Sequence, residues 1–476
     1  MCYDIYHTSF GRDAGSKMKR HTEIDMVHGP LLKNMWVFAL PIIAMNLLQL
    51  LFNAADMVVV GRFNGSEALG AVGATGALIN LLVNLFMGLS VGTSVIVAQD
   101  YGANKPADVS RSVHTSIAVS AIGGVAVGVL GFALCRPLLH VMGTPEDIMD
   151  LAVLYMRIYF VGMPANMVYN FGAAVLRAVG DSRHPMYYLI ISGIVNVILN
   201  LFFVVVCKMS VDGVAWATVI SQYLSVVMLM ICLMRSEGCI RYHWKKTAID
   251  KEKLIKLTRI GLPAGMQGTL FSISNVLIQS AVNSFGSSLV AASSAASNLE
   301  GMVGTTMNAY YNAAITFTGQ CVGAGEKKRI DSIVKVCLVF IVITWVVLGG
   351  ASMLFARPLL SIYSTDPAVL DLGVMKLNIM MMVYFTCGIM NVLPGVMRGM
   401  GYSIVPMLIT LVGACLLRIV WLYTAFAWYP TIPVLFACYP VTWTLAAIGH
   451  VVSYLAVRKR QGIAAAPTQN LEKPQI

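Results

Sequence analysis

The chain has 476 residues, of which 58% are hydrophobic and only 12% are charged. A soluble globular chain has about 25% charged residues, so this composition excludes a soluble protein and predicts a surface that mostly faces lipid. The formal net charge of +11 would suit a nucleic-acid partner. The positions of the basic residues along the chain explain this net charge without a nucleic-acid partner.

Twelve apolar segments follow one another along the chain, and each is long enough to cross a bilayer as a helix. They lie near residues 34–61, 68–98, 111–134, 151–177, 185–207, 211–234, 254–284, 289–320, 330–355, 369–398, 403–427 and 433–457. The sequence therefore predicts an all-α integral membrane protein with twelve transmembrane helices. Pro164 and Pro394 are expected to interrupt the fourth and the tenth of them.

Basic residues gather on one side of the predicted membrane. When loops are assigned to alternating sides, the side with both termini holds 26 Lys and Arg residues. The opposite side holds only four, and three more fall within segments. These seven are Arg62, Arg136, Lys208 and Arg357, then Arg157, Lys376 and Arg418. The positive-inside rule thus predicts cytoplasmic termini, and the asymmetry itself supports an even number of helices.

The same layout occurs twice in the chain. Runs that begin at Gln99, Arg136 and Arg177 recur 221 residues later at Gln320, Arg357 and Arg398, and Leu40-Pro41 recurs as Leu262-Pro263 with one extra residue. Between the copies lies a basic polar stretch. Internal repeats in a membrane protein are typical of transporters, which place their site at the repeat interface.

These features predict five parts. They are a cytoplasmic tail over residues 1–33, a six-helix lobe over 34–235, a basic cytoplasmic linker over 236–253, a second six-helix lobe over 254–457, and a cytoplasmic tail over 458–476. Because each lobe has an even number of helices, the lobes share one orientation and are expected to be pseudo-symmetric about an axis along the membrane normal.

Away from their ends, the apolar segments contain only two acids, Asp56 in the first and Glu300 in the eighth. A carboxylate at membrane depth is costly unless it is protonated, paired or bound to an ion, so each is a functional hypothesis. For Asp56 the alternative is a structural hydrogen bond to a neighbouring helix. For Glu300 the alternative is a salt bridge with Lys376 or Arg418.

Amide and hydroxyl side chains near Asp56 complete a candidate cation site. Asn53 precedes Asp56 by three residues on one helix face, Asn196 and Asn200 are four apart on the fifth helix, and Thr218 is on the sixth. Oxygen donors around one carboxylate suit either sodium or a proton, and the spacing does not choose between them.

A second set of residues is expected to contact substrate together with Glu300. These residues are Gln49, Gln267, Asn275, Asn308, Tyr311 and Met381. Flexible Met and aromatic side chains can adapt to varied apolar ligands, although core packing is the simpler interpretation for any one of them.

No sequence feature indicates an enzyme or a cofactor. The chain has no GxxxxGK[ST], GxSxG or HExxH motif. Its ten Cys residues include no CxxC pair, which argues against a disulfide framework or a zinc site. Residues 1–30 lack the apolar stretch of a signal peptide.

Several of these motifs, taken in order, resemble the multidrug and toxic compound extrusion family of cation-coupled antiporters. They are Leu40-Pro41 with Asn53–Gly61, Gln99–Ala103, Arg177–Ser182 and Gly319–Gly325. The resemblance covers roughly residues 31–457. It implies two six-helix lobes around a central cleft in a bacterial inner membrane, exporting organic cations and drugs in exchange for sodium or protons.

The resemblance also assigns residues. In the branch with a cation site in the first lobe, the first-helix carboxylate matches Asp56, the fifth-helix amide matches Asn196 and the sixth-helix threonine matches Thr218, which makes these three a candidate sodium site. Asn200 stands where that branch has an aspartate, so the coupling ion and its stoichiometry are open. Glu300 matches an eighth-helix acid found in part of the family.

Two rival functions follow from the same sequence. A lipid-linked glycan flippase of related architecture would need a cationic cleft, to which Arg157, Lys376 and Arg418 could contribute. A channel or receptor would show a filter motif or rings of charge, and none is present. The expected partners are small organic molecules and the lipid bilayer. Two lobes in one chain favour a monomer.

Overall fold

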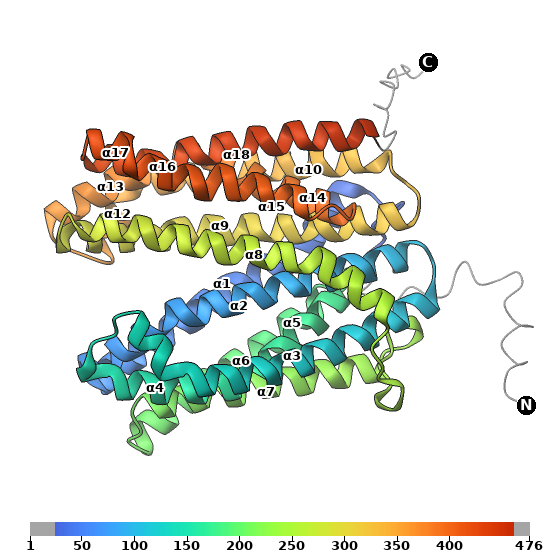
Figure 1. Ribbon diagram of the computed structural model, residues 1–476, viewed down its shortest axis with the longest axis horizontal. Coiled ribbons are helices and arrows are strands. Elements are labelled where there is room, and N and C mark those ends of the chain that lie inside the picture. Colours follow the sequence, from blue (N-terminus) through green and yellow to red (C-terminus); the bar gives the residue numbers. More distant parts are fainter. Residues whose placement is uncertain (1–23, 461–476) are drawn as a thin grey trace, which may run out of the picture.

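The computed structural model describes residues 24–460, with the side chains of residues 66, 69, 77, 80 and 81 left out. The first half of the chain forms a bundle of long helices (Figure 1). They are α1 (Leu31–Phe63), α2 (Gly65–Gly102), α3 (Pro106–Val141), α4 (Glu146–Val161), α5 (Met163–Ala178), α6 (Arg183–Leu201), the π-helical η1 (Phe202–Val206) and α7 (Val211–Arg235).

Two short 3-10 turns, η2 (Gly238–Ile240) and η3 (Trp244–Lys246), lead into the second bundle. Its elements are α8 (Lys251–Asn283), α9 (Ser287–Gly323), α10 (Arg329–Thr344), η4 (Trp345–Gly349), α11 (Gly350–Leu354), α12 (Ala356–Ser361), α13 (Pro367–Met381), α14 (Tyr384–Gly399), α15 (Ile404–Thr410), η5 (Leu411–Leu416), α16 (Leu417–Tyr423), α17 (Ala425–Trp428) and α18 (Ile432–Arg460).

Twelve predicted segments correspond to twelve helical spans among the described residues. Eight spans are long and apolar enough to cross a membrane, and two more are the bent pairs α4–α5 and α13–α14. The remaining two are α8 and α9, with 33 and 37 residues. These two are less apolar because they carry polar side chains such as Gln267 and Asn308. Large apolar side chains, including Val129 and Ile198, are exposed on the outside of the bundle, as lipid contact requires.

Both bent spans have a local explanation, and only one is at the expected proline. The α4–α5 pair bends by 46°, next to Pro164 in the first turn of α5. The expectation of a break at Pro394 was wrong, because Pro394 lies inside α14 and the 47° bend comes at Met382–Val383. There the Trp345 indole donates to the Met381 carbonyl at 2.7 Å, which satisfies a backbone group at the bend.

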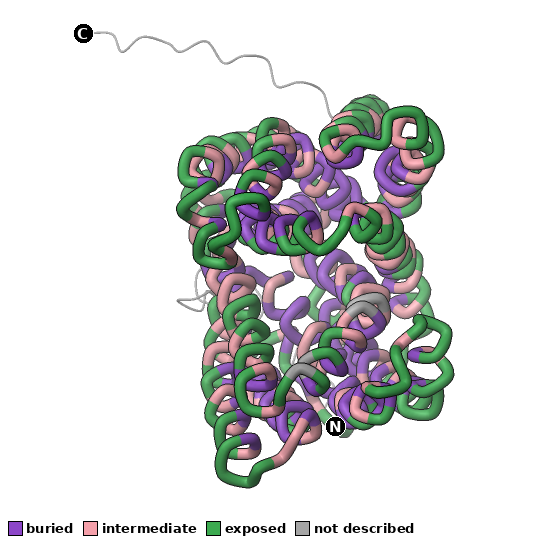
Figure 2. Tube along the Cα trace, turned by 90° about the vertical axis from the view of Figure 1, so that its left-hand side faces the viewer, coloured by how far each residue is buried: buried purple, intermediate pink, exposed green. Residues whose placement is uncertain are grey.

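The ends of the bundle define two sides. α1 begins and α18 ends at the right of Figure 1, and we call this the termini side. Seen from the opposite side, buried positions lie inside each half and exposed positions surround them (Figure 2).

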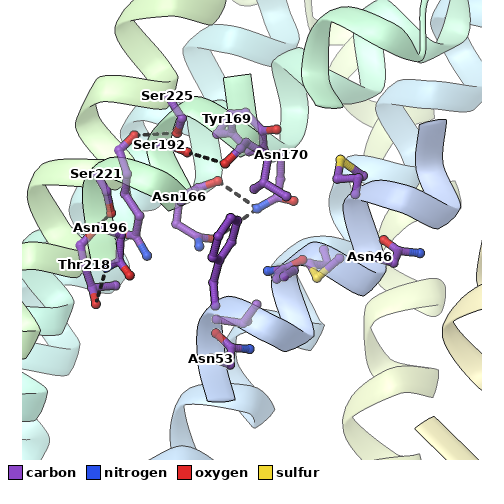
Figure 3. Close-up of a pocket in the computed structure, with 18 of the residues that line it drawn as sticks. Asn46, Asn53, Asn166, Tyr169, Asn170, Ser192, Asn196, Thr218, Ser221 and Ser225 are labelled. Atoms are coloured by element: carbon purple, nitrogen blue, oxygen red, sulfur yellow. Dashed lines mark hydrogen bonds between the residues drawn. The ribbon is translucent and has the colours of Figure 1, made fainter. Parts of the chain in front are cut away.

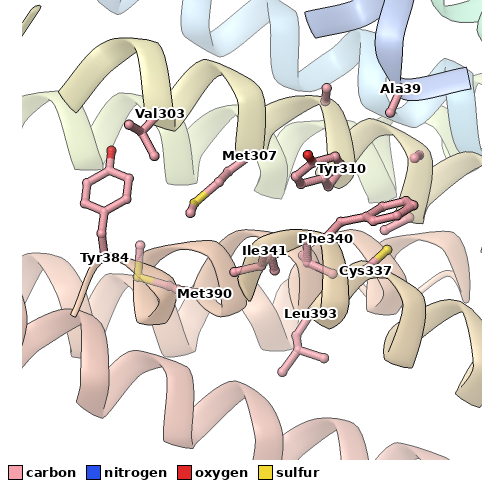
Figure 4. Close-up of a cluster of buried hydrophobic side chains, with 14 of the residues drawn as sticks. Ala39, Val303, Met307, Tyr310, Cys337, Phe340, Ile341, Tyr384, Met390 and Leu393 are labelled. Atoms are coloured by element: carbon pink, nitrogen blue, oxygen red, sulfur yellow. The ribbon is translucent and has the colours of Figure 1, made fainter. Parts of the chain in front are cut away.

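The first helix of each half packs partly into the buried core of the other half. Phe38 and Ile42 of α1 belong to the buried cluster of the second half, and the Phe38 ring meets Phe317 edge-on at 5.8 Å. Figure 4 shows this cluster, with Ala39 of α1 beside α9. Conversely, Leu257 and Ile260 of α8 lie in the buried cluster of the first half. Each half is therefore held against the other near the termini side.

A pseudo-symmetric pair of hydrogen bonds joins the halves on the termini side. Gln99 donates to the Gly399 carbonyl at 2.8 Å, and Gln320 donates to the Ala178 carbonyl at 2.7 Å. Both donors and both acceptors are related by the 221-residue repeat. A Cβ on Gly102 would lie 2.1 Å from the Gln320 carbonyl, and one on its repeat partner Gly323 would lie 2.0 Å from that of Gln99. The repeated motifs thus build this contact.

The linker between the halves is attached to the first half. The Asp250 amide donates to Thr115 at 3.0 Å, and Arg111 donates to the Asp250 carboxylate at 3.2 Å. The first turn of α8 adds Lys253, which is buried and reaches Asp100 at 2.7 Å. These contacts anchor the start of the second half on α2 and α3.

Candidate functional site

A cavity of about 230 Å³ lies between the helices of the first half and α9 of the second. Most of the residues that line it carry polar side chains, which is unusual at membrane depth. The polar residues are Asn46, Gln49, Asn53 and Asp56 of α1, Asn166, Tyr169, Asn170 and Arg177 of α5, Ser192 and Asn196 of α6, Thr218, Ser221, Gln222 and Ser225 of α7, and Asn308 and Asn312 of α9. Figure 3 shows ten of them converging from several helices. Among the described residues that line this cavity, Asp56 is the only acid and Arg177 the only base.

Four of the predicted cation-site residues form one chain of hydrogen bonds. The Asn200 amide donates to the Asp56 carboxylate and also to Asn196 Oδ1 at 3.3 Å. Asn196 in turn donates to Thr218 Oγ1 at 3.4 Å, an interaction drawn in Figure 3. Helix periodicity explains the arrangement, because residues four apart on α6 share the face that meets α1 and α7.

The same chain leaves acceptor oxygens for a ligand. Asn196 and Asn200 are almost fully buried, and Asn200 Oδ1 has no hydrogen-bond partner. Buried polar atoms without a partner are uncommon and call for an explanation, such as an ion. Carboxylate, amide and hydroxyl oxygens are the ligands that hard cations prefer, so this set fits a small cation.

Gln49 and Asn53 of α1 line the cavity on the same side as Asp56. The spacings of seven and three residues place all three on one helix face, as the sequence predicts. The structure thus brings every predicted cation-site residue to one place.

The polar face of α5 was not predicted from the sequence. Asn166, Asn170 and Arg177 line the cavity at helical spacing, and the Asn170 amide donates to the Asn166 side chain at 3.0 Å. The missed signal is a stripe of polar residues at intervals of four and seven within an otherwise apolar segment.

A second cavity of about 170 Å³ lies between α2, α5, α8 and α9. It shares Met87, Arg177, Asn308 and Asn312 with the first cavity, so the two are neighbours. The predicted substrate residues Asn308 and Tyr311 both line it. A polar path therefore leads from the Asp56 site to the interface between the halves.

Glu300 lies elsewhere, in the second half, and is paired with Lys376. Lys376 Nζ lies 3.5 Å from the Glu300 carboxylate and donates to Ser293 and Ser297 at 3.1 and 2.6 Å. Both charged side chains are buried. Of the two cations that the sequence offered as partners, the structure selects Lys376.

Three other predicted substrate residues are also engaged within the second half. The Asn275 side chain accepts from Arg418 at 2.8 Å, and Gln267 accepts from Arg398 at 2.6 Å. Met381 is fully buried in the cluster of Figure 4, so its side chain lines neither cavity in this structure. The polar face that the sequence indicates in this half is thus largely used to satisfy buried arginines.

Comparisons with known proteins identify the family. A match to the MatE family covers residues 41–202 and again residues 263–424, together more than half of the chain. The chain belongs to the MatE family. The two matched stretches start 222 residues apart, as do Pro41 and Pro263 of the sequence repeat.

Individual relatives agree with this assignment. The chain is 29% identical to the "Probable multidrug resistance protein YoeA" of Bacillus subtilis, over 80% of this chain and 83% of that one. It is 25% identical to the "FAD transporter" of Shewanella oneidensis, over 74% and 78%. The fold matches a solved multidrug resistance MATE family transporter in an outward-facing conformation, with a TM-score of 0.85 and 21% identity, over 93% of this chain and 99% of that one.

The family settles the class of protein. Its members are membrane transporters, so the prediction of a transporter rather than an enzyme is confirmed, as are the all-α fold and the twelve helices. Family membership also implies small-molecule substrates and a multi-pass membrane location, without an organic cofactor. No cluster of three or more His, Cys, Asp or Glu side chains suited to a metal occurs among the described residues.

Proposed function

We propose that this protein is a secondary active antiporter that exports organic cations and drugs by alternating access, in exchange for sodium or protons. The observation that carries the proposal is the chain Asp56–Asn200–Asn196–Thr218, which sets one carboxylate and several oxygen acceptors in a polar cavity at membrane depth. We assign the ion to this site, with Asn53 lining the same space.

The ion drives export if ion and cargo prefer different states of the transporter. One positive charge that crosses the membrane potential supplies about 2.3 kcal/mol per 100 mV. A cation bound at Asp56 would compete with the hydrogen bond from Asn200 to the Asp56 carboxylate. Helices α1 and α6, which carry these two residues, would then shift around the cavity. Gln49, Asn308 and Tyr311 contact the cargo in this proposal because they line the two cavities.

The proposed orientation places the termini side in the cytoplasm of a bacterial inner membrane. The support is the excess of Lys and Arg on that side. We further propose that the transporter works as a monomer, since one chain contains both halves of the path.

The three cations that the sequence offers for the flippase alternative do not form a cationic cleft. Arg418 is fully buried against Asn275, Lys376 pairs with Glu300, and Arg157 is exposed beside the Phe132 ring. None of these three cations lines the two cavities described above.

The test uses the purified protein in liposomes, with a sodium gradient and a proton gradient imposed separately and ethidium efflux followed by fluorescence. We expect one gradient to drive efflux in the wild type and Asp56→Asn to abolish it. Asp150→Asn is the matched control, because it makes the same change at an exposed carboxylate of the same half. Undiminished efflux by Asp56→Asn would remove Asp56 from the mechanism.

A further inference from the structure

Arg177 is a cation that lines both cavities without a counter-group among the described residues. No hydrogen bond or ion pair joins its side chain to another residue of the described range 24–460. Asp56, the only acid of the first cavity, does not line the second, whereas Arg177 does. Arg177 is in the last turn of α5, toward the termini side, and its guanidinium lines polar cavities without a partner in the described part of the chain. A charged group left in this way calls for an explanation, such as a ligand.

The sequence repeat provides an internal comparison for Arg177. Its counterpart 221 residues later is Arg398, which is satisfied by two partners. Arg398 donates to the Tyr311 hydroxyl at 2.5 Å and to Gln267 Oε1 at 2.6 Å. In the second half, therefore, the repeated arginine is held by the protein itself.

The first half lacks equivalents of both partners of Arg398, which are Gln267 and Tyr311. At the repeat offset of 222 that relates Pro41 to Pro263, Met45 stands in the place of Gln267. At the offset of 221 that relates Gln99 to Gln320, Ser90 stands in the place of Tyr311. A thioether is a weak acceptor, and the Ser90 hydroxyl donates to the Met87 carbonyl at 2.7 Å. The Arg398 guanidinium is therefore hydrogen-bonded within its own half, whereas the Arg177 guanidinium is exposed to the cavities.

The other two cations buried in the membrane region, Lys376 and Arg418, have partners on the protein. Lys376 bonds Ser293 and Ser297 and faces Glu300, and Arg418 bonds Asn275 and lies over the Tyr439 ring at 4.4 Å. Arg177 differs from both of them because its side chain has no partner among residues 24–460 and lines the two cavities, which Lys376 and Arg418 do not.

Resting on the transport function proposed above, we infer that Arg177 binds an anionic group, a carboxylate or a phosphate, on the organic cargo. A guanidinium presents a planar fork of donors that fits either group with two parallel bonds. The Asn308 side chain lines the same two cavities, and its amide nitrogen can donate to the remaining oxygens. Its Oδ1 accepts from the Asn312 amide at 2.9 Å. We therefore expect the transporter to accept organic anions and zwitterions in addition to cations such as ethidium.

The test measures binding of matched fluorescent pairs to the full-length protein in phosphatidylcholine nanodiscs. One pair is riboflavin and its phosphate ester FMN, and the other is rhodamine 123 and its free acid, rhodamine 110. We expect the anionic member of at least one pair to bind about tenfold or more tightly than its neutral or esterified partner, because hydrogen bonds to charged groups are the strong ones.

Variants connect the preference to the residue. We expect Arg177→Gln to abolish it and Arg177→Lys to keep part of it, since lysine retains the charge but not the fork. Arg157→Gln, the same change at an exposed arginine that lines neither cavity, should keep the full preference. Each variant is first checked for unchanged thermal melting.

Two results would overturn the inference: no preference for the anionic member in either pair, or a preference that survives in Arg177→Gln. Either result would leave ethidium efflux and its dependence on Asp56 intact, whereas failure of the antiport proposal would appear as no gradient-driven efflux at all. Repeating the measurement with 30% phosphatidylglycerol identifies the source of the anion. Weaker FMN binding there would show that a lipid headgroup competes for Arg177, and unchanged binding would indicate a soluble cargo.

Discussion

The two glutamine bonds on the termini side lead to a quantitative prediction about conformational equilibrium. Alternating access requires that the halves separate on this side in one state, which breaks the contacts of Gln99 and Gln320 with the opposite half. Replacing either glutamine by leucine removes the donor and leaves a carbonyl unsatisfied in the closed state. Each change should cost about 1–3 kcal/mol in the closed state alone, which is a shift of about 5- to 150-fold toward the open state.

The assay is a pulsed EPR distance measurement in nanodiscs. Spin labels at Lys105 and Lys327, exposed positions next to the ends of α2 and α9, would report the separation of the halves after Cys2 and Cys207 are replaced by serine. We expect the longer-distance population to grow in Gln99→Leu and in Gln320→Leu. Because the two bonds are related by the repeat, the two effects should be similar in size.

The control is Gln279→Leu. It makes the same substitution at an exposed glutamine whose amide bonds Asn283 within its own helix. This variant should match the wild type. Longer-distance populations in Gln99→Leu and Gln320→Leu that stay within twofold of the wild type would refute the reasoning, and so would opposite shifts in the two variants.

Further predictions concern the second half and the linker. Glu300→Gln should destabilise the protein by about 3–5 kcal/mol, because it leaves the buried Lys376 uncompensated, and adding Lys376→Met should restore thermal melting. Efflux that returns in this double variant would show that Glu300 does not contact the cargo. Phe317→Ala, at a fully buried ring against Phe38, should cost about 3–5 kcal/mol, measured by chemical denaturation, and a loss below 1 kcal/mol would argue against the exchanged packing of α1. The Lys253 amide and Arg111 hold the pKa of Asp250 below its usual value, so linker docking should be stable at neutral pH and be lost as the pH falls below about 4. Hydrogen exchange of the linker measures this, and Asp250→Asn should exchange fast already at pH 7.

The membrane spans could be predicted from the sequence because each depends on local hydropathy alone. The bend at Met382–Val383 could not, because no proline or glycine marks it and it coincides with a bond from Trp345 on a different span. The sequence wrongly predicted a break at Pro394, because the proline alone does not determine where the span bends. A proline removes one backbone donor, but the surrounding helices decide whether the helix bends there.

In the candidate site, too, contacts within one helix could be predicted from the sequence and pairings between helices could not. Helix periodicity could place Asn196 beside Asn200, and Gln49 beside Asp56, because residues on one helix face need no knowledge of the neighbours. It could not choose between Lys376 and Arg418 as the partner of Glu300, since that choice depends on the relative height of three different helices. Pairing between distant helices is a property of the packed bundle.

The two halves of the repeat thus have the same helix arrangement but differ in the partners of their buried charged side chains. In the second half, buried charged side chains have partners on neighbouring helices, as Lys376 has in Glu300 and Arg398 has in Gln267 and Tyr311. In the first half, Asp56 and Arg177 face the cavity, one with only an amide partner and the other with none among the described residues. A buried charge that its own protein leaves unsatisfied can be satisfied by what the protein binds. Divergence between the repeats therefore concentrates the charged groups of the proposed binding site in the first half.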